Sequence, residues 1–214
     1  MPKLDKNIGE FFSKFPSKKY PKGAVLLNPE ELPPGVIYLK DGYVRQFTIS
    51  DEGVELTLHI YSPNAHFPMF WALNGSENKH YFQAVTAIEI AISPKEKFIQ
   101  FLKLHPDSLF SFTRRVISGL EGLSRRIEIT SFGSAYQRVV SMLLFLARHF
   151  GEKSQEKITL TSKFTHHEIA GLAGLSRERT SIEMEKLIKK GLIKYNNHKI
   201  IIADLKKLSS EVKN

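Results

Sequence analysis

The stretch that decides the fold is THHEIAGLAGLSRERTSIEMEKL, which runs from Thr165 to Leu187. It predicts two short helices joined by a tight turn. Thr165 can cap the first helix through its hydroxyl oxygen, and Glu168, three residues later, can complete a capping box. Gly174 offers the positive φ that a sharp turn needs, and Ser176 can cap the second helix. This spacing is typical of a helix-turn-helix unit.

The second helix is expected to cover residues 177–190 and to end at Gly191. Three of its apolar residues are expected to face the core: Ile182, Leu187 and Ile188. Two apolar segments follow, LIKY and KIII, on either side of Asn196-Asn197-His198. A tight turn between two such strands predicts a hairpin, the wing of a winged helix-turn-helix domain. An ordinary helical hairpin is the alternative, and the added wing argues against it.

These residues resemble the DNA-binding end of the Crp/Fnr family of bacterial transcription regulators. The resemblance lies in Thr165–Glu178, Leu187–Ile193 and Ile200–Leu208. It implies an α+β protein with a jelly-roll β-barrel sensor over residues 1–106, a dimerisation helix and hinge over 107–133, and a winged helix-turn-helix domain over 134–214. The implied function is sequence-specific regulation of transcription by a homodimer that reads a two-fold symmetric operator in double-stranded DNA.

The resemblance also implies how the DNA is read, because the second helix of such domains lies in the major groove. Arg177 can donate two hydrogen bonds to a guanine, and Glu178 can accept one from a cytosine amino group. Arg179 and Ser181 lie on the same face or at its rim. The family pattern S-R-E-T-V-S/G-R differs here, since Arg179 is extra and Ile182 replaces the last arginine. The expected phosphate contacts are Thr165, His166, Ser176, Thr180, Lys194, Asn197, His198 and Lys199.

The distribution of charge supports a nucleic-acid partner. The chain has 214 residues, suited to one or two domains, and a net charge of +9. Residues 134–214 hold 15 Lys and Arg against 8 Asp and Glu, whereas residues 1–133 hold 16 against 14. The excess of positive charge therefore accompanies the helix-turn-helix, where phosphate groups need to be neutralised.

Several other classes of protein are not expected. The chain has no cysteine, which excludes disulfides, thiol catalysis and cysteine-ligated metals. It has no long apolar run or signal peptide, so we expect a cytoplasmic protein that makes no membrane contact. We find no catalytic motif and expect neither an enzyme nor a cofactor. His166 and His167 are adjacent in a helix and point apart, so no metal site is expected there. RNA polymerase is an expected partner if the protein activates transcription.

The first hundred residues predict a helix and then a β-rich domain. Residues 4–15 have apolar residues at helical spacing, and the segments AVLL, VIYLK, YVRQFTI, VELTLHIY and YFQAVTAIEIAI predict strands. Asp41-Gly42 is the clearest hairpin signal, and Asp51-Glu52-Gly53 is a second one. Short strands at this spacing favour a sandwich or a small barrel.

The ligand motif of the family's sensor is not present. That motif has a Gly-Glu pair and then Arg-Ser/Thr-Ala, but Pro68-Met69 and Asn78-Lys79-His80 stand here instead. We therefore do not expect cyclic nucleotide binding. A repurposed effector pocket would use Phe67, Met69, Phe70, Trp71, Lys79, His80 and Tyr81. An apolar ligand or a haem that switches DNA binding is an alternative, with His59, His66 or His80 as axial ligand; a third possibility is that the aromatic side chains only fill the core.

Residues 94–104 predict a short helix, and a longer one is expected from about Asp107 to Phe132. Steps of three and four residues separate its apolar positions, as in a coiled-coil seam. The expected dimer interface is this seam: Leu109, Phe112, Val116, Leu120, Leu123 and Ile127. A second line, Phe110 and Ile117, is expected to rest on the sensor. The alternative is a buried helix of a monomer.

Overall fold

The structure is a computed structural model that describes residues 5–154 and 157–212. Contacts divide the chain into two compact units. The first, here called the sensor unit, holds the chain up to Thr48 and the segment Thr57–Gly122, and the second holds Ile49–Leu56 and the chain from Leu123 onward. The division falls within helix α4 (Pro106–Phe132). The hinge predicted at the end of the dimerisation helix stays a prediction, and Gly133 directly follows the last residue of α4.

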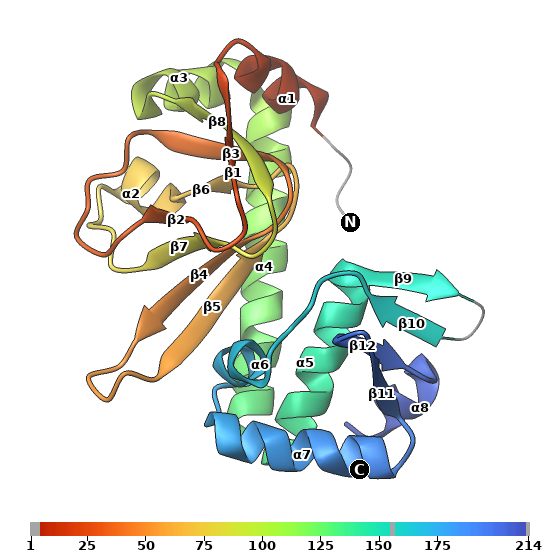
Figure 1. Ribbon diagram of the computed structural model, residues 1–214. Coiled ribbons are helices and arrows are strands. Elements are labelled where there is room, and N and C mark those ends of the chain that lie inside the picture. The colour runs from red at the N-terminus through yellow and green to blue at the C-terminus, as the bar shows by residue number, and fades with distance from the viewer. Residues whose placement is uncertain (1–4, 155–156, 213–214) are drawn as a thin grey trace. The chain divides into compact units, whose positions relative to one another are not determined.

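Eight strands form two four-stranded sheets in the N-terminal half (Figure 1). One sheet has the order β1 (Ser17–Tyr20), β8 (Ile88–Ser93), β3 (Val36–Asp41), β6 (His66–Phe67). The other has the order β2 (Val25–Leu27), β7 (Tyr81–Ala84), β4 (Val44–Ile49), β5 (Glu55–Tyr61). This is the strand order of a jelly roll, which confirms the predicted topology. The two sheets remain separate, so of the predicted alternatives, a sandwich or a small barrel, the jelly roll takes the form of a two-sheet sandwich.

Of the two hairpins that the turn residues predict in the N-terminal half, the structure contains one. The hairpin at Asp51–Gly53 is confirmed, because β4 and β5 are neighbours in one sheet. The hairpin at Asp41-Gly42 is wrong, since β3 and β4 lie in different sheets. Gly42 has φ +82°, and a Cβ there would collide with the backbone oxygen of Ala87. Glycine at this position therefore allows the chain to turn sharply from one sheet into the other. The predicted strand over 81–92 is two strands, and β1 and β6 were not predicted.

The space between the two sheets is filled by apolar side chains. Nine buried residues form this cluster: Leu27, Ile37, Leu39, Val44, Phe67, Phe82, Ala84, Ile88 and Ile90. The rings of Phe67 and Phe82 are stacked, with centroids 5.1 Å apart, and Tyr61 lies 4.6 Å from Phe67. Aromatic side chains thus occupy the interior of the jelly roll, as one of the three sequence interpretations held.

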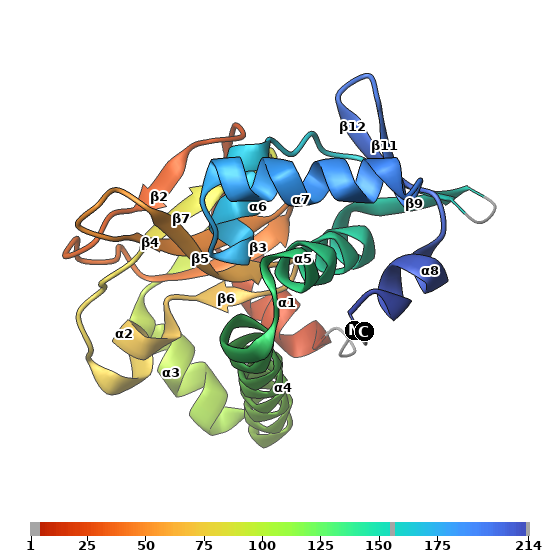
Figure 2. The ribbon, with the colours of Figure 1, turned by 90° about the horizontal axis from the view of Figure 1, so that it is seen from below.

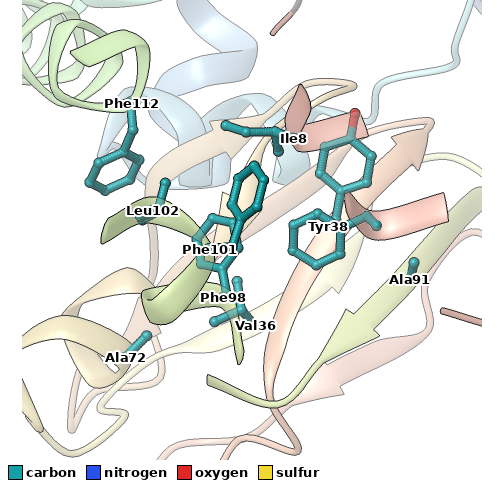
Figure 3. Packing of buried hydrophobic residues seen from close by; sticks show 10 residues of the cluster. Ile8, Val36, Tyr38, Ala72, Ala91, Phe98, Phe101, Leu102 and Phe112 are labelled. Carbon is teal, nitrogen blue, oxygen red and sulfur yellow. The ribbon is translucent and has the colours of Figure 1, made fainter. Parts of the chain in front are cut away.

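A second apolar cluster lies between the β1-β8-β3-β6 sheet and the helices α1 (Lys6–Ser13), α2 (Met69–Asn74), α3 (Lys95–Leu104) and α4. Figure 3 shows side chains of these elements converging, among them Ile8, Tyr38, Phe98, Phe101 and Phe112. Helix α1 confirms the predicted N-terminal helix, although residue 4 lies outside the described residues.

The face that α4 turns toward the sensor differs from the prediction. Phe112 is buried in the second cluster, so its assignment to the dimer interface is corrected. Phe110 and Ile117 are 66% and 53% exposed, so they do not rest on the sensor. The inward side is instead set by Ser108, Phe112 and the half-buried Arg115, at i, i+4 and i+7. The other seam residues are exposed in the single chain: Leu109, Val116, Leu120, Leu123 and Ile127.

The C-terminal domain is a winged helix-turn-helix. Helices α5 (Ala135–Phe150), α6 (His166–Ala173) and α7 (Arg177–Lys189) pack with the short α8 (Leu205–Ser210). A four-stranded sheet has the order β11 (Ile193–Asn196), β12 (Lys199–Ile202), β10 (Lys157–Leu160), β9 (Gly151–Ser154). Strand β9 pairs antiparallel with β10 at the edge of this sheet. None of the helices in the described part of the chain has the length and apolar content that crossing a lipid bilayer requires.

Candidate nucleic-acid interface

The helix-turn-helix is built by the capping groups that its sequence predicts. The Thr165 hydroxyl accepts a hydrogen bond from the Glu168 amide (3.1 Å), and the Glu168 carboxylate accepts one from the Thr165 amide (2.7 Å). Gly174 ends α6 with φ +62°. Arg138 of α5 donates to the backbone oxygens of Ala173 (3.0 Å) and Gly174. The turn is therefore fixed from the helix beneath it, which sets where α7 begins.

Helix α7 turns a different face inward from the predicted one. Ser176 caps it by accepting from the Arg179 amide (3.2 Å), as expected. Leu187 is fully buried, but Ile182 and Ile188 are 49% and 41% exposed, so the prediction was wrong for these two isoleucines. The remaining inward positions are taken by Thr180, Glu183 and Met184.

The buried carboxylate of Glu183 explains this orientation and engages one predicted DNA contact. Its oxygens lie 2.8 Å from the Arg179 guanidinium and 2.8 Å from the Lys186 ammonium. A buried charge needs such partners, because removal from water is costly. The Arg179 guanidinium is therefore held against Glu183, although the Arg179 side chain is still 53% exposed. Thr180 is fully buried, so its predicted phosphate contact is also corrected.

The surface that remains is called here the outer face of α7 and consists of Arg177, Glu178, Ser181 and Ile182. Arg177 and Ser181 are four residues apart, as are Glu178 and Ile182, so they form two adjacent stripes near the start of the helix. Figure 2 shows α7 in front of α6 and beside α5, with the β11-β12 hairpin near its C-terminal end. An exposed helix with polar residues in its first turns is the element that a major groove can accept.

A chain of hydrogen bonds links the outer face to the wing. His166 Nε2 lies 2.9 Å from the Tyr195 hydroxyl, and His166 Nδ1 lies 2.7 Å from Ser181 Oγ. Ser181 Oγ donates to the backbone oxygen of Arg177 (3.0 Å). Because that hydroxyl hydrogen is used, Nδ1–H donates to Ser181 and Nε2 accepts from Tyr195. Burial raises the pKa of Tyr195 to about 12, so its hydroxyl keeps the proton it donates.

This chain changes the roles of two predicted contacts. His166 and Ser181 were expected to meet DNA, but their polar atoms bond to each other and to protein partners. They hold α6, α7 and β11 in one arrangement. Tyr195 was missed by the sequence interpretation, and no local signal could identify it, because its partner His166 is 29 residues away.

The wing has the geometry that its turn residues predict. Asn197 and His198 have φ of +48° and +62°, and Asn196 pairs with Lys199 across the hairpin. Two consecutive residues at positive φ are typical of a type I′ turn. Lys194, Asn197 and His198 are exposed and Lys199 is half-buried. The predicted wing is confirmed, and its tip presents cationic and polar groups.

The C-terminal end of α7 is fastened by a separate polar cluster. Glu211 accepts from the Lys190 ammonium (2.6 Å) and from the Tyr136 hydroxyl (2.7 Å). The hydrogen bond from Lys190 lowers the pKa of Glu211, and the same bond raises the pKa of Lys190. These contacts join α5 and α7 to the segment after α8. Both ends of α7 are thus held by side chains from other elements of the domain.

The residues of the predicted effector pocket do not come together. Phe67 lies between the two sheets, whereas Met69 and Trp71 pack against the helix-side cluster and Phe70 is 71% exposed. Tyr81 stacks on Phe47 with centroids 4.9 Å apart, His80 Nδ1 lies 3.0 Å from Gln46 Nε2, and Lys79 is exposed. The prediction of one pocket formed by all seven side chains is therefore corrected.

The three histidines considered as haem ligands each contact a different set of residues. His59 lies edge-on against Tyr61, His66 is buried between Phe98 and Phe112, and His80 bonds to Gln46. Burial lowers the pKa of His80. Within the residues that the structure describes, no group of three histidine or acidic side chains has the arrangement of a metal site.

Comparison with known proteins agrees with the geometry of both halves. Residues 17–105 match the profile of the cyclic nucleotide-binding domain, and residues 137–211 match that of the Crp-like helix-turn-helix domain. The global nitrogen regulator of Nostoc sp. PCC 7120 is 28% identical over 169 residues, which cover 78% of this chain and 76% of the relative. The cAMP-activated global transcriptional regulator CRP of Pasteurella multocida is 25% identical, over 94% of this chain and 96% of the relative.

Solved structures give the same result. A transcriptional regulator of the CRP/FNR family from Thermus thermophilus superposes with a TM-score of 0.78 and 26% sequence identity. The superposition covers 93% of this chain and 99% of the regulator. The likeness therefore extends over the jelly roll, α4 and the winged helix-turn-helix together.

Proposed function

Because the chain belongs to the Crp/Fnr family of transcription regulators, we propose that it acts as a homodimer that reads a two-fold symmetric DNA operator through the outer face of α7. The observation that carries this proposal is the outer face itself. Arg177 and Glu178 occupy the first turn of a helix that is held at both ends, next to a wing that carries Lys194 and Lys199. Activation of transcription would add RNA polymerase as a partner, and we propose the cytoplasm as the site of action.

Helix α4 supports the two-fold symmetric assembly. Five apolar side chains at steps of seven, four, three and four residues are between 42% and 57% exposed in the single chain: Leu109, Val116, Leu120, Leu123 and Ile127. A row of this kind along one helix is typical of a coiled-coil seam. A second copy of the same helix, related by a two-fold axis, would cover it. The dimer would then present two copies of α7 to two half-sites.

The interface divides into residues that read bases and residues that position the protein. The guanidinium of Arg177 can donate two parallel hydrogen bonds to guanine O6 and N7, and Glu178 can accept from cytosine N4. Lys194, Asn197, His198 and Lys199 lie on the wing, where flexible cationic and polar groups meet phosphates. The proposal also keeps Ser176 as a phosphate contact, since it stands at a helix N-terminus. It does not keep Thr165, because the amide and the hydroxyl of Thr165 both donate to the Glu168 carboxylate.

Substitution of Arg177 and of Lys199 by alanine is expected to have different effects. Arg177→Ala should weaken binding to the operator by about 1–3 kcal/mol per half-site and leave binding to random DNA nearly unchanged. Lys199→Ala should weaken both by similar factors and lower the slope of log affinity against log salt by about one for each protomer. The measurement is fluorescence anisotropy with operator and random duplexes over a series of salt concentrations.

Arg177→Lys is the matched control, because it keeps the positive charge and loses the planar pair of donors. It should bind random DNA like the unmodified protein and lose most of the discrimination. Equal weakening of both duplexes by Arg177→Ala would show that Arg177 meets only the phosphate backbone. Failure of the unmodified protein to prefer any sequence would contradict the proposed function as a whole.

Cyclic AMP is not the effector in this proposal, although one relative is named as cAMP-activated. Pro68 has no amide hydrogen to donate to a phosphate. The side-chain amide of Asn78 donates to the backbone oxygens of Asn28 (2.7 Å) and His80 (3.0 Å), and the imidazole of His80 is engaged by Gln46. Calorimetry with cyclic AMP is expected to give no binding in the micromolar range, and micromolar or tighter affinity would contradict this expectation.

A further inference from the structure

Ile182 is a residue of the outer face that takes part in none of the proposed base or phosphate contacts. Its side chain is 49% exposed, one helical turn after Glu178, on the side of α7 away from Thr180 and Leu187. A half-exposed isoleucine contributes less to the core of the domain than a buried one, and isoleucine is not a strong helix former. Single exposed apolar side chains are common, but this one stands among the residues that would face base edges.

The neighbours of Ile182 sharpen the chemistry of this position. The adjacent hydroxyl of Ser181 is engaged in both directions, by His166 Nδ1 and by the backbone oxygen of Arg177. Arg179 is held by Glu183. The C-terminal part of the outer face therefore offers a hydrocarbon surface, while the polar groups of Arg177 and Glu178 lie one turn nearer the start of the helix.

We propose that Ile182 selects thymine at one position in each half-site by contact with the thymine C5-methyl group. This inference rests on the proposed function, since it requires α7 to lie in the major groove. The methyl of thymine is the apolar group that an unmodified base pair presents there. The other bases would place a hydrogen-bonding edge against the hydrocarbon, where that edge would lose water without gaining a partner.

The experiment removes only the methyl group from the DNA. An operator is first selected from a random pool, and each thymine is then replaced by deoxyuridine, one symmetric pair at a time. At one pair the unmodified protein should bind about fourfold more weakly per half-site, or about fifteenfold for both, as expected for loss of one buried methyl. Ile182→Ala should show no dependence on deoxyuridine at that pair and Ile182→Val a partial one.

Ile188→Ala is the matched control, because Ile188 is 41% exposed on the same helix and lies outside the outer face. It should respond to deoxyuridine as the unmodified protein does. Thermal unfolding of each variant checks that the domain is intact. The proposal is overturned if the unmodified protein binds every deoxyuridine operator equally well, or if Ile182→Ala keeps the full response. Failure to select any operator would be a different result: it would contradict the proposed function, and the inference would fall with it.

Discussion

Replacement of both Leu120 and Leu123 by glutamate is expected to yield a monomer that binds the operator about 10²–10⁴-fold more weakly than the unmodified protein. Both side chains are about half exposed in the single chain, at 57% and 46%, so a carboxylate at either position can reach solvent in the folded monomer. In a two-fold symmetric interface each substitution is present twice, which brings like charges together across the seam. The loss of affinity follows because the second half-site is no longer bound by a linked subunit.

Sedimentation velocity and gel retardation of the same samples test this expectation. Leu104→Glu is the matched control, because Leu104 is a still more exposed leucine, at 68%, on α3 and outside the seam. That variant should remain a dimer and keep its affinity. An unmodified protein that sediments as a monomer at micromolar concentration would exclude the proposed interface. A double variant that stays dimeric would place the interface elsewhere.

The parts of the molecule that the sequence predicted well are those that local chemistry determines. The capping box of Thr165 and Glu168, the left-handed Gly174 and the cap at Ser176 all depend on residues within four positions of one another. The wing turn at Asn197-His198 is of the same kind. Each of these features is determined by hydrogen bonds and backbone angles within one turn, so it does not depend on contacts with distant parts of the chain.

The errors concern which face of a helix is buried. Apolar spacing placed Phe112 in the dimer seam and Ile182 in the core, and both assignments were wrong. In each case polar residues occupy inward positions that a count of apolar residues overlooks. Ser108 and Arg115 lie on the sensor side of α4, and Glu183 lies on the inner side of α7 with two cations as partners. When polar residues occupy part of the buried face of a helix, some of the apolar residues of that helix lie on its exposed face.

Contacts between distant segments were not predicted at all. The Asp41-Gly42 signal was interpreted as a hairpin, because an Asp-Gly pair between two strands gives no information about which sheet each strand joins. The jelly roll places those two strands in different sheets. The bond between His166 and Tyr195 is similar, since its two ends meet only after the wing has folded onto α6.

The second large effect concerns the stability of the sensor unit at acid pH and depends on His66. This side chain is 6% exposed, and its ring lies 5.3 Å from that of Phe98 and 5.1 Å from that of Phe112. Its Nδ1 has no hydrogen-bond partner among the described residues. Burial, and to a smaller extent the positive charge of Arg115, lowers the pKa of His66 to about 3.

Arg115 is itself fixed close to the same core. Its guanidinium donates to the backbone oxygen of Asn64 (2.7 Å), and its charge interacts with Tyr38 and Asp5. It cannot move away from His66 without breaking that bond. A proton on the folded histidine would therefore face a positive charge from α4 and aromatic rings from α3 and α4, and among the described residues Nδ1 has no acceptor.

The sign of the pH dependence follows from this environment. The pKa of a histidine in an unfolded chain is about 6.5, so the unfolded state takes up a proton between pH 6.5 and 3 while the folded state does not. The contribution of neutral His66 to stability is complete above pH 6.5 and is lost as the pH falls toward 3. The slope is about 1.4 kcal/mol per pH unit, or roughly 2.7 kcal/mol between pH 6.5 and 4.5.

His66→Phe should remove this dependence while still filling the space between the two phenylalanines. The free energy of unfolding is measured in urea at pH 7.0 and 4.5, with the fluorescence of Trp71 as the signal, because the single tryptophan of the chain lies in the sensor unit. Carboxylates titrate in both proteins, so the informative quantity is the difference between unmodified protein and variant. That difference should shift by about 2–3 kcal/mol in favour of the variant at the lower pH.

His198→Asn serves as the control, since His198 is exposed on the wing and asparagine tolerates its positive φ. Its pH dependence should follow that of the unmodified protein. A difference between unmodified protein and His66→Phe that is the same at both pH values would mean that His66 takes up a proton in the folded state. The buried ring would then need an acceptor or water at Nδ1, and the sensor core around α4 would be less closed than its contacts with Phe98 and Phe112 indicate.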